Sequence, residues 1–349
     1  MISLKETSLL IKQKALQLGF HLIGFAPAEP PEKSSFLDEW LAMGYAADMA
    51  YLHRNSADRK NLRNRFPWAE SLICVAFRYP QDRPGDGLAP HIARYAQGDD
   101  YHLVLDRPLR DLESYVHEIS VERIGRNPRT WRYIDTGPVL EKAYARAAGI
   151  GWMGKNTLIL NERLGSYLLL GQIITDLTIP PDDPAAERCG SCTRCLDACP
   201  TGAFVAPYVL DSSRCISYHT IESKKKIPHT IAQKLPPNLF GCDICQEVCP
   251  WNQQEPPHPA EPDLLTASFL TRPNYNALRI TDLVEMEPGR FQMEFRKSPL
   301  KRPGLAKIRA TAKIISDPAS TKEPAEEKTQ PESPSPTPRS SMRQNIPSA

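Results

Sequence analysis

Two cysteine runs in the second half of the chain constrain its fold more than any other feature. The first reads C-G-S-C-T-R-C-L-D-A-C-P from Cys189, and the second reads C-D-I-C-Q-E-V-C-P from Cys242. The first run has the bacterial ferredoxin spacing C-x2-C-x2-C-x3-C-P, which holds [4Fe–4S] clusters through thiolate sulfur. The second run lacks one cysteine of that pattern, and Cys215, between the runs, is the natural substitute. The sequence therefore predicts a domain built around two clusters.

The ligand sets are predicted to cross between the runs. In two-cluster ferredoxins the fourth cysteine of a run ligates the other cluster, because it lies a helical turn away from the first three. The predicted ligands of the first cluster are Cys189, Cys192, Cys195 and Cys249. The predicted ligands of the second cluster are Cys199, Cys215, Cys242 and Cys245. Each cluster takes four thiolates, so these eight cysteines supply both clusters and none remains unassigned.

Zinc and disulfides explain these cysteines less well. Zinc takes four ligands, usually as two C-x2-C pairs, which gives no reason for a triple run or for the proline after each final cysteine. Disulfides need an oxidising compartment, and the first residues show neither a secretory nor a twin-arginine signal. The ninth cysteine, Cys74, lies in the apolar run 72–77 and is expected to be a small buried hydrophobe.

Length, charge and hydropathy set the outer bounds. The chain has 349 residues, 41% of them hydrophobic, which is enough for two domains. No apolar run approaches the length of a membrane span, so we expect no membrane partner and a cytoplasmic location, which suits oxygen-sensitive clusters. Because the net charge is only +2, any surface for nucleic acid has to be a local patch.

The predicted fold class is α+β. Strand and helix patterns alternate up to residue 179, which indicates an α/β-layered domain. The strands are predicted at 21–25, 72–77, 129–134, 157–160 and 167–175, and the helices at 4–18, 36–43, 105–119 and 138–148. The predicted divisions are the layered domain over 1–180, a ferredoxin-like domain over 181–262, a short helical C-terminal region over 263–316, and a disordered tail over 317–349. The tail is rich in Pro, Ser, Glu and Lys and nearly free of aliphatic residues, so it cannot bury enough apolar surface to order itself.

Outside the cysteines, two features leave alternatives open. Asp135 follows a predicted strand and precedes a predicted helix that starts with Pro138. It is either a helix N-cap or an acid at the carboxyl end of a buried strand, where ligands commonly bind. Lys224, Lys225 and Lys226 form a compact basic run, which is either a solvated face or a phosphate-binding patch. The basic residues between 290 and 302 are candidates to extend that patch.

Several motifs together resemble the epoxyqueuosine reductase family. They are D-T-G-P from Asp135, G-I-G-W-M-G-K-N from Gly149, Gly165-Ser166, the first cysteine run, C-I-S-Y and T-I-E from Cys215, and C-P-W-N from Cys249. The resemblance covers about residues 1 to 309. It implies cobalamin in the N-terminal domain, two [4Fe–4S] clusters, an external low-potential electron donor and a monomer. It also implies reduction of the epoxide of epoxyqueuosine at the wobble base of tRNA to give queuosine.

The resemblance also assigns residues. It implies that Asp135 is the proton donor. The cobalamin contacts that it implies are Arg59, Lys155, Asn156, Ser166, Ser217, His219, Glu222, Pro250 and Trp251. Two departures stand out: family members commonly have Leu where this chain has His219, and some members have a helical-repeat extension that helps to bind tRNA, in place of the tail expected here.

Two other functions fit part of the pattern. A reductive dehalogenase-like enzyme shares cobalamin and clusters but acts on organohalides, and the absence of an export signal and the local lysines argue against it. A non-catalytic ferredoxin-like electron carrier explains the clusters alone. Such a carrier needs far fewer residues, so the large N-terminal domain is expected to hold the electron acceptor.

Overall fold

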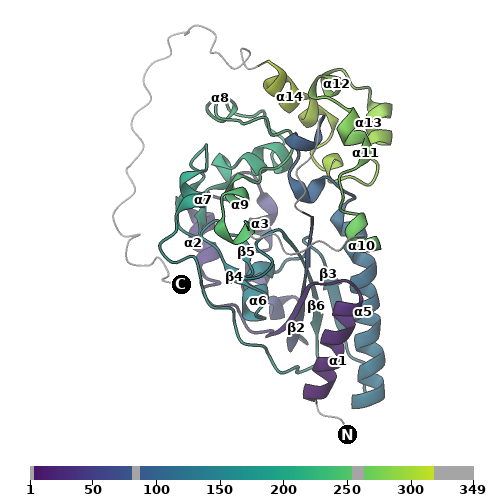
Figure 1. Cartoon of the computed structure of the whole chain (residues 1–349). Coiled ribbons are helices and arrows are strands. Elements are labelled where there is room, and N and C mark those ends of the chain that lie inside the picture. Colours follow the sequence, from purple (N-terminus) through teal and green to yellow (C-terminus); the bar gives the residue numbers. More distant parts are fainter. Residues whose placement is uncertain (1–3, 81–86, 254–262, 318–349) are drawn as a thin grey trace.

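An antiparallel sheet organises the N-terminal half of the protein. The computed structural model describes residues 4–80, 87–253 and 263–317. The sheet has four strands in the order β1-β2-β6-β3 (Figure 1). Their bounds are Leu22–Pro27 for β1, Ser71–Arg78 for β2, Thr130–Tyr133 for β3 and Leu168–Thr175 for β6. All eight residues of β2 are buried, as its continuous apolar pattern predicts, and Cys74 within it is 1% exposed.

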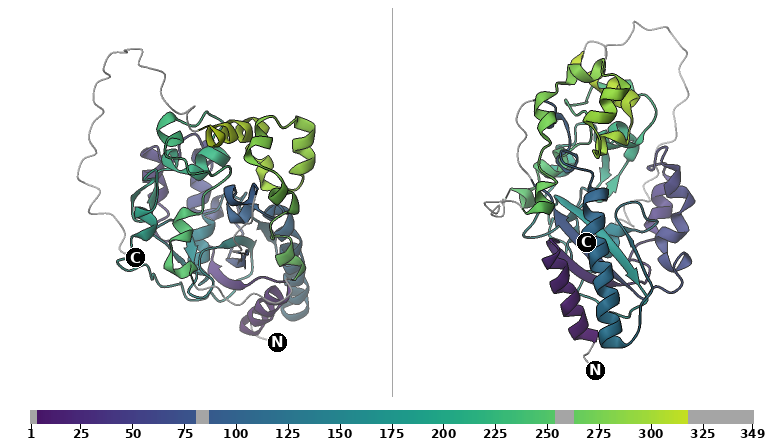
Figure 2. Two further views of the ribbon diagram at one scale, coloured as in Figure 1. Left: turned by 45° about the horizontal axis from the view of Figure 1, so that its top comes forward. Right: turned by 90° about the vertical axis from the view of Figure 1, so that its right-hand side faces the viewer.

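Helices cover both faces of this sheet. α1 (Leu4–Gln17) and α5 (Tyr101–Ile124) lie side by side on one face, and α6 (Glu141–Ala147) packs against the other (Figure 2). The apolar residues that recur at spacings of four and three along α5 are all buried, namely Leu105, Leu109, Leu112, Val116 and Ile119. The spacing of Leu9 and Leu16 predicts that they share one face of α1, but both are 53% exposed, while Ile11 and Ala15 face the core. The layered fold is confirmed.

The segment after β3 differs from the prediction. The helix expected from Pro138 begins at Glu141, and its N-cap residue is Leu140, with no side-chain cap. Asp135 lies in the preceding loop with a φ of 60°, a left-handed conformation that is rare for residues other than glycine. Asp135 therefore caps no helix. The rule about the carboxyl ends of strands does not apply either, because it concerns parallel sheets and this sheet is antiparallel.

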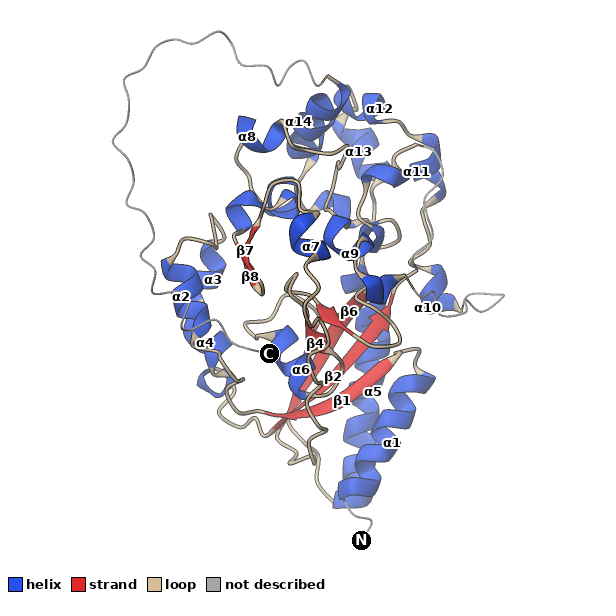
Figure 3. Cartoon of the chain, turned by 60° about the vertical axis from the view of Figure 1, so that its left-hand side comes forward, coloured by secondary structure: helices blue, strands red, loops and turns tan. Residues whose placement is uncertain are grey.

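Short elements carry the cysteine runs. α7 (Arg194–Asp197) and α9 (Ile244–Glu247) are four-residue helices that lie within the first and second runs (Figure 3). Between the runs come the hairpin of β7 (Phe204–Ala206) and β8 (Val209–Leu210) and a π-helical turn at Tyr218–Glu222. A second small hairpin, β4 (Trp152–Met153) with β5 (Ile159–Leu160), follows α6. Its turn holds Lys155 and Asn156.

The C-terminal helices share a core with other parts of the chain. They are α10 (Leu264–Ala267), α11 (Pro273–Ala277), α12 (Ile280–Val284), α13 (Pro288–Glu294) and α14 (Leu305–Ser316). Tyr275 and Phe295 pack in one cluster with Leu88 and Ile92, and also with Phe240 beside the second cysteine run. The C-terminal helices are therefore fixed against the cluster segment. Of the predicted tail, 317–349, only Asp317 belongs to the described residues, as the C-cap of α14.

The remaining helices are short. They are α2 (Phe36–Ala42), α3 (Ala50–Arg54), α4 (Ser56–Lys60) and α8 (His229–Ala232). α2 is close to the helix predicted at 36–43. Among the described residues no helix is both long and apolar enough to cross a bilayer.

Candidate active site

The fold brings cysteines of the two runs close to one another. The thiol of Cys195 is close enough to those of Cys189 and Cys249 for their charges to raise its pKa, and Cys192 acts in the same direction. The thiols of Cys242 and Cys245 are influenced in the same way by Cys215, and that of Cys242 also by Cys199. Cysteines of the two runs thus lie near one another, also across the predicted sets, since Cys195 influences Cys245. The crossed assignment of ligands stays a prediction.

Burial affects the pKa of the thiols in both sets more than the charges of neighbouring thiolates do. It is the largest cause that raises the pKa of Cys195 to about 11 and that of Cys242 to about 12. Free thiols at these positions would be protonated at neutral pH, whereas coordination to a metal removes the proton. The environment therefore suits thiolates that have iron as their counter-charge.

A buried donor faces the first set. The indole Nε1 of Trp152 is buried and has no hydrogen-bond partner within normal reach among the described residues. Trp152 packs against Cys249 and Cys189. Burial raises the pKa of the Cys189 thiol overall, while the Trp152 N–H acts in the opposite direction and favours the thiolate. A cluster held by these cysteines would bring sulfur acceptors beside that donor. The residues present therefore fit an iron–sulfur cluster at this position.

A cavity of about 370 Å³ lies between the sheet and the second cysteine set. One wall comes from the N-terminal domain and includes Asp135, Glu141, Ile159 and the residues Leu168 to Leu170. The opposite wall includes all four cysteines of the second set, Cys199, Cys215, Cys242 and Cys245. A mostly apolar cleft with a few polar groups is the usual form of a cofactor site. The lining of one cavity thus includes the four cysteines predicted to bind the second cluster as well as the carboxyl groups of Asp135 and Glu141.

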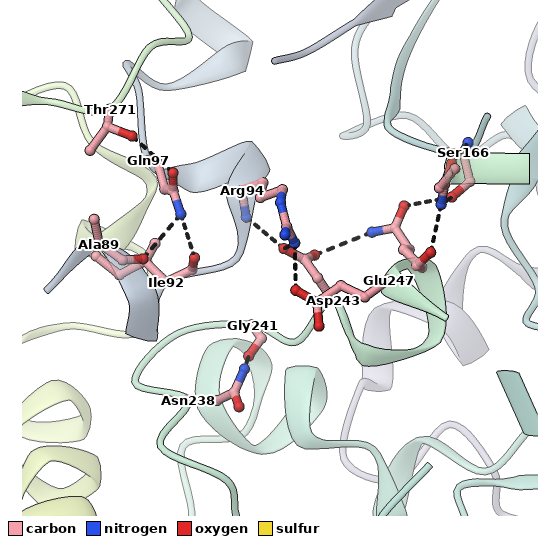
Figure 4. A network of polar contacts seen from close by, with 12 residues as sticks. Ala89, Ile92, Arg94, Gln97, Ser166, Asn238, Gly241, Asp243, Glu247 and Thr271 are labelled. Atoms are coloured by element: carbon pink, nitrogen blue, oxygen red, sulfur yellow. Dashed lines mark hydrogen bonds and ion pairs between the residues drawn. The ribbon is translucent and has the colours of Figure 1, made fainter. Parts of the chain in front are cut away.

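Polar contacts hold the second run against the rest of the chain. The backbone N–H of Arg94 donates to Oδ2 of Asp243 at 2.7 Å, and its guanidinium donates to Oε1 of Glu247 at 2.6 Å (Figure 4). Asp243 is buried between two of the cluster cysteines. In the same network the amide of Gln97 donates to the carbonyls of Ala89 and Ile92, both at 3.0 Å. The 89–97 segment thereby fixes α9 in place.

Three groups contact the Asp135 carboxylate. The hydroxyl of Tyr101 donates to Oδ2 at 2.9 Å. Nε2 of His102 lies 3.4 Å from the same oxygen, and the Arg302 guanidinium lies 3.8 Å from it. These partners come from the start of α5 and from the C-terminal region, so three distant segments meet at this carboxylate.

The electrostatics of Asp135 favour its ionised form. Burial alone would raise the pKa of its carboxyl group, but hydrogen bonds from His102 and Tyr101 and the charges of His102 and Arg302 lower it below its usual value. A residue with a strained backbone and a perturbed pKa in a cavity is a candidate functional group. Asp135 meets all of these criteria.

Glu141 is a second carboxyl group in the cavity wall. Burial, and then the nearby charge of Asp135, raise the pKa of Glu141 to about 7. Two carboxyl groups with pKa values pushed in opposite directions are a recurring arrangement in acid–base sites. Sequence analysis missed Glu141, although it stands six positions after Asp135 in the D-T-G-P-V-L-E motif.

Three of the predicted cofactor contacts line the cavity: Asn156, Ser166 and Ser217. Ser166 is tied to the cysteine segment, since its hydroxyl donates to Oε1 of Gln246 at 2.9 Å and its backbone N–H donates to Oδ1 of Asn252 at 2.7 Å. Gly165 permits this approach, because it has a φ of +70° and a Cβ would meet Oδ1 of Asn252 at 2.1 Å. Their role toward a cofactor stays a prediction.

The other predicted contacts do not line the described cavity. Lys155 donates through Nζ to the carbonyl oxygens of Gly190 at 2.5 Å and Cys192 at 3.0 Å, so it holds the loop of the first run. Arg59 donates to the carbonyl oxygen of Val139 at 3.2 Å, in the loop that follows Asp135. The structure places these two side chains in supporting positions around the site.

His219 and Glu222 belong to the π-helical turn. Nε2 of His219 lies 2.7 Å from the carbonyl oxygen of Ser213, and burial lowers the pKa of this histidine, so the ring is neutral and held by the backbone. Glu222 pairs with Arg302 at 2.9 Å. Pro250 and Trp251 follow the last cysteine, and the Trp251 ring meets Trp152 edge-on at 5.0 Å beside the first set.

The comparisons with known proteins agree with this geometry. Residues 59–136 match the family model "Epoxyqueuosine reductase QueG, DUF1730", and residues 188–252 match the "4Fe-4S double cluster binding domain". An epoxyqueuosine reductase from Synechocystis sp. is 40% identical over 296 residues, which covers 83% of this chain and 98% of that protein. The chain belongs to the epoxyqueuosine reductase family. It is therefore an oxidoreductase, and its 188–252 segment is a domain for two [4Fe–4S] clusters.

Further epoxyqueuosine reductases support this membership. The Gloeobacter violaceus protein is 38% identical, with 88% of this chain and 95% of that protein covered. A crystal structure of epoxyqueuosine reductase with an epoxyqueuosine-modified tRNA-Tyr stem loop superposes with a TM-score of 0.78 at 29% identity, covering 90% of this chain and 81% of that chain. The Bacillus subtilis enzyme, solved with the loop of its catalytic aspartate swung out of the active site, gives a TM-score of 0.77 at 28% identity, with 91% and 84% covered.

The basic run is connected to the site through Arg302. Lys224, Lys225 and Lys226 are all exposed. Nζ of Lys224 donates to the carbonyl oxygen of Arg302 at 3.1 Å, and the Arg302 side chain lies 3.8 Å from Asp135. Lys225 lies 3.9 Å from Asp48.

Four residues at the site were missed from the sequence of this family member: Tyr101, His102, Glu141 and Arg302. The first two stand in a D-Y-H sequence at the start of α5, where an N-cap aspartate was a readable signal. Arg302 was named only as part of a basic patch. No sequence pattern indicated that it meets Asp135, because that contact joins the C-terminal region to the loop after β3.

Proposed function

We propose that this protein reduces the epoxide of epoxyqueuosine at the wobble position of tRNA to give queuosine, in the cavity between Asp135 and the second cysteine set. The observation that carries the proposal is the pairing of a carboxyl group and a cluster-binding wall across one cavity. Membership of the epoxyqueuosine reductase family over 83% of the chain supports the reaction. The tRNA stem loop bound to a related enzyme supports the substrate.

The two cysteine sets would hold the [4Fe–4S] clusters in the crossed arrangement. Cys189, Cys192, Cys195 and Cys249 would hold the cluster beside Trp152, and the other four cysteines the cluster at the cavity. Both clusters carry electrons singly, from an external low-potential donor. Since the second set forms the cavity wall, its cluster is the one that would deliver electrons into the cavity.

The cavity itself fits cobalamin. The apolar side chains of Leu168 and Leu170, on one face of β6, offer a surface for a flat macrocycle, and Asn156, Ser166 and Ser217 offer polar contacts at its edge. Cobalamin, when bound, would supply the strongly reducing metal centre that the epoxide requires. The protein's part is to bind, orient and protonate. Arg59, Lys155, His219, Glu222, Pro250 and Trp251 remain proposed contacts, or supports of contacts.

Asp135 is the proposed route of the proton to the epoxide oxygen. It is in the cavity wall, and the catalytic aspartate loop of the related Bacillus subtilis enzyme gives the role a precedent. Protonation of the leaving oxygen as its bond to carbon breaks is general acid catalysis. The hydroxyl of Tyr101 orients the carboxylate through its 2.9 Å hydrogen bond.

The proposed tRNA surface is formed by Lys224, Lys225 and Lys226 together with Arg302. Lys224 contacts Arg302, and Arg302 lies 3.8 Å from Asp135, so tRNA phosphates that bind these cations would bring the wobble base close to the cavity. Phosphate contacts of this kind position a nucleic acid without reading its sequence. We further propose that the protein works as a cytoplasmic monomer without a membrane partner.

The test combines a spectrum with a product assay. Anaerobically prepared protein is expected to show cluster absorption, to bind added cobalamin, and to convert epoxyqueuosine in tRNA to queuosine, measured by mass spectrometry of the released nucleosides. Clusters without cobalamin binding would favour an electron carrier. Turnover of an organohalide in place of tRNA would favour a reductive dehalogenase-like enzyme.

A further inference from the structure

The proposed reaction needs more protons than one ionised aspartate supplies. Conversion of an epoxide to an alkene breaks both C–O bonds, takes up two electrons and two protons, and releases one water. The electrons come singly from the low-potential donor through the clusters. Asp135 is held in its ionised form by its neighbours, and a carboxylate accepts protons but cannot donate them. The chain therefore has to bring protons to Asp135 from another group.

A chain of contacts leads from Asp135 to a histidine and a second aspartate. Nε2 of His102 lies 3.4 Å from Oδ2 of Asp135, and Nδ1 of His102 lies 2.8 Å from Oδ1 of Asp100. The first distance is long for a hydrogen bond, but catalytic contacts are often long in the absence of substrate and tighten when it binds. The imidazole thus bonds Asp100 through Nδ1, while Nε2 is buried, makes no hydrogen bond among the described residues and has Asp135 as its nearest carboxylate.

The start of α5 fixes this imidazole. Asp100 is the N-cap residue of α5, and its side chain accepts from the backbone N–H of His102 at 3.1 Å. The same carboxylate oxygen meets Nδ1, so one residue caps the helix and orients the ring. The ring of Tyr101 stacks on that of His102 with centroids 4.0 Å apart. A rigid helix end therefore presents Nε2 to Asp135.

His102 also lies at the boundary of two cavities. It does not line the large cavity, but it lines a second pocket of about 240 Å³ together with Arg132 and Thr136. That volume is ample for water molecules, and the His102 side chain is 27% exposed. Asp135 lies in the wall of the large cavity. The contact between His102 and Asp135 therefore connects a solvent-accessible pocket to the proposed reaction cavity.

The charges around His102 favour its protonated form. Burial alone would lower the pKa of the imidazole, but the hydrogen bonds and charges of Asp100 and Asp135 raise it to about 9. Titratable and charged groups from several elements surround the imidazole. On or next to α5 they are Asp100, Tyr101 and Asp106. From other elements they are Arg132 on β3, Asp135 in the loop after β3, Glu141 on α6 and Arg302 in the C-terminal region. At neutral pH His102 therefore holds the proton that Asp135 lacks.

We propose that His102 is a proton-relay residue, which stores a proton at Nε2, passes it to Asp135, and is recharged from the second pocket. The inference rests on the proposed function and deepens it. In each turnover the first proton goes from Nε2 through Oδ2 of Asp135 to the epoxide oxygen as the first C–O bond breaks. A proton taken up from bulk solvent through the second pocket recharges the imidazole, and the second proton then goes through Asp135 to release the oxygen as water. His102 acts through Asp135, while Asp135 contacts the substrate.

Two other groups near Asp135 are alternatives to His102 as the residue that holds the proton. Tyr101 donates to Asp135, but burial and the charge of Asp135 raise the pKa of its hydroxyl far above the usual range, so its proton is held tightly. Glu141 has a pKa near 7, but the structure gives no hydrogen bond between its carboxyl group and Asp135 among the described residues. Both alternatives predict a different variant pattern from His102.

The test uses the protein with clusters and cobalamin, and epoxyqueuosine-containing tRNA. His102→Gln keeps a polar side chain of similar length but cannot carry an imidazolium proton. We expect a loss of kcat of about a hundredfold, the lower range for general acid–base catalysis, with tRNA affinity and cluster content unchanged. The wild-type rate is expected to fall as the pH rises through about 9, where His102 loses its proton. This alkaline limb should be missing in the variant.

The matched control is His117→Gln on the same helix. His117 contacts Asn127 at 2.6 Å and Thr130 at 2.8 Å and lies outside both cavity linings, so near-wild-type activity is expected. Added imidazole should restore part of the activity of His102→Ala. Histidine-selective NMR provides a measurement independent of turnover: the wild-type His102 resonance should titrate well above pH 6.5, and Asp100→Asn should lower that value.

Each outcome has a distinct meaning. Turnover of His102→Gln within twofold of wild type, with its alkaline limb intact, would overturn the relay. If the fall of the rate at alkaline pH disappeared in Tyr101→Phe or in Glu141→Gln, but not in His102→Gln, the proton would be held by Tyr101 or by Glu141, respectively. If the wild-type holoenzyme bound the tRNA and left its epoxide intact, the proposed function would fail together with the relay.

Discussion

The two walls of the cavity are built in different ways. The cysteine wall comes from two short runs, each with local spacing that sets which thiols share a site. The carboxylate wall is assembled from the start of α5, the loop after β3, the start of α6 and the C-terminal Arg302. The first wall is encoded by neighbours in sequence and the second by tertiary packing. Spacing can therefore identify the electron side of such a site, whereas the proton side emerges only in the folded chain.

The largest effect is expected from replacing cysteines that are predicted to bind the clusters. Cys249→Ser is expected to damage the cluster built on Cys189, and Cys199→Ser the cluster built on Cys242, because the ligand sets cross. Iron content should fall from about eight to about four atoms per chain in each variant. Anaerobic iron analysis with electron paramagnetic resonance measures both the loss and which cluster remains. Damage confined to the cluster of the mutated run would mean that the sets do not cross.

A second variant probes the surface outside the carboxylate wall. Replacing Lys224, Lys225 and Lys226 together by Gln removes three exposed positive charges. We expect weaker binding of tRNA at every sequence, and a slope of log affinity against log salt that is smaller by about two to three, since each lost phosphate contact contributes nearly one unit. Binding measured at several salt concentrations gives the slope. An unchanged slope would place the tRNA elsewhere, for example on the basic residues near Arg290.

A smaller effect is expected from the cation beside Asp135. Arg302→Gln removes a cation 3.8 Å from Asp135 and 2.9 Å from Glu222. Because Arg302 is 43% exposed, and partly exposed ion pairs contribute little, turnover should fall by about fivefold or less. The pKa of Asp135 should rise toward its usual value, because a positive charge that favours the carboxylate is lost. Arg290→Gln, which affects only a pair with Glu294 on α13, is the matched control for the pH–rate profile.

The smallest effect is expected at the C-terminus. Deleting the chain from Asp317 onward should leave folding, cobalamin binding and turnover unchanged, because the composition of that segment cannot bury enough apolar surface to stabilise a fold. Thermal unfolding and the absorption spectrum with added cobalamin check this expectation. A large loss of either property would show that the segment contributes to the folded protein.

The same contrast explains what sequence analysis could predict. Strong apolar patterns identified β2 and the buried face of α5, and a strict spacing identified the two cysteine sets. The pattern around Leu9 and Leu16 did not indicate which face of α1 is buried, because the orientation of α1 is set by its packing on α5 and the sheet. Pro138 suggested a helix start that the chain delays until Glu141.

The contacts of Asp135 could not be predicted from the sequence, for a physical reason. Its partners Tyr101 and Arg302 approach through the sheet and the shared C-terminal core, and no local pattern encodes that approach. Its φ of 60° likewise depends on the surrounding fold. The residue was singled out by its position and by family resemblance, while its protonation state and its relay became visible only in three dimensions.

The most direct test of the account is single turnover by Asp135→Asn, with clusters reduced and cobalamin and tRNA bound. Asparagine tolerates the left-handed backbone that Asp135 adopts, and its amide oxygen can still accept from Tyr101, so the variant should fold and bind normally. An amide delivers no proton at neutral pH, so we predict that queuosine forms about a hundred to ten thousand times more slowly than with the wild type. Queuosine formation at the wild-type rate would contradict the central claim that protons reach the epoxide through Asp135.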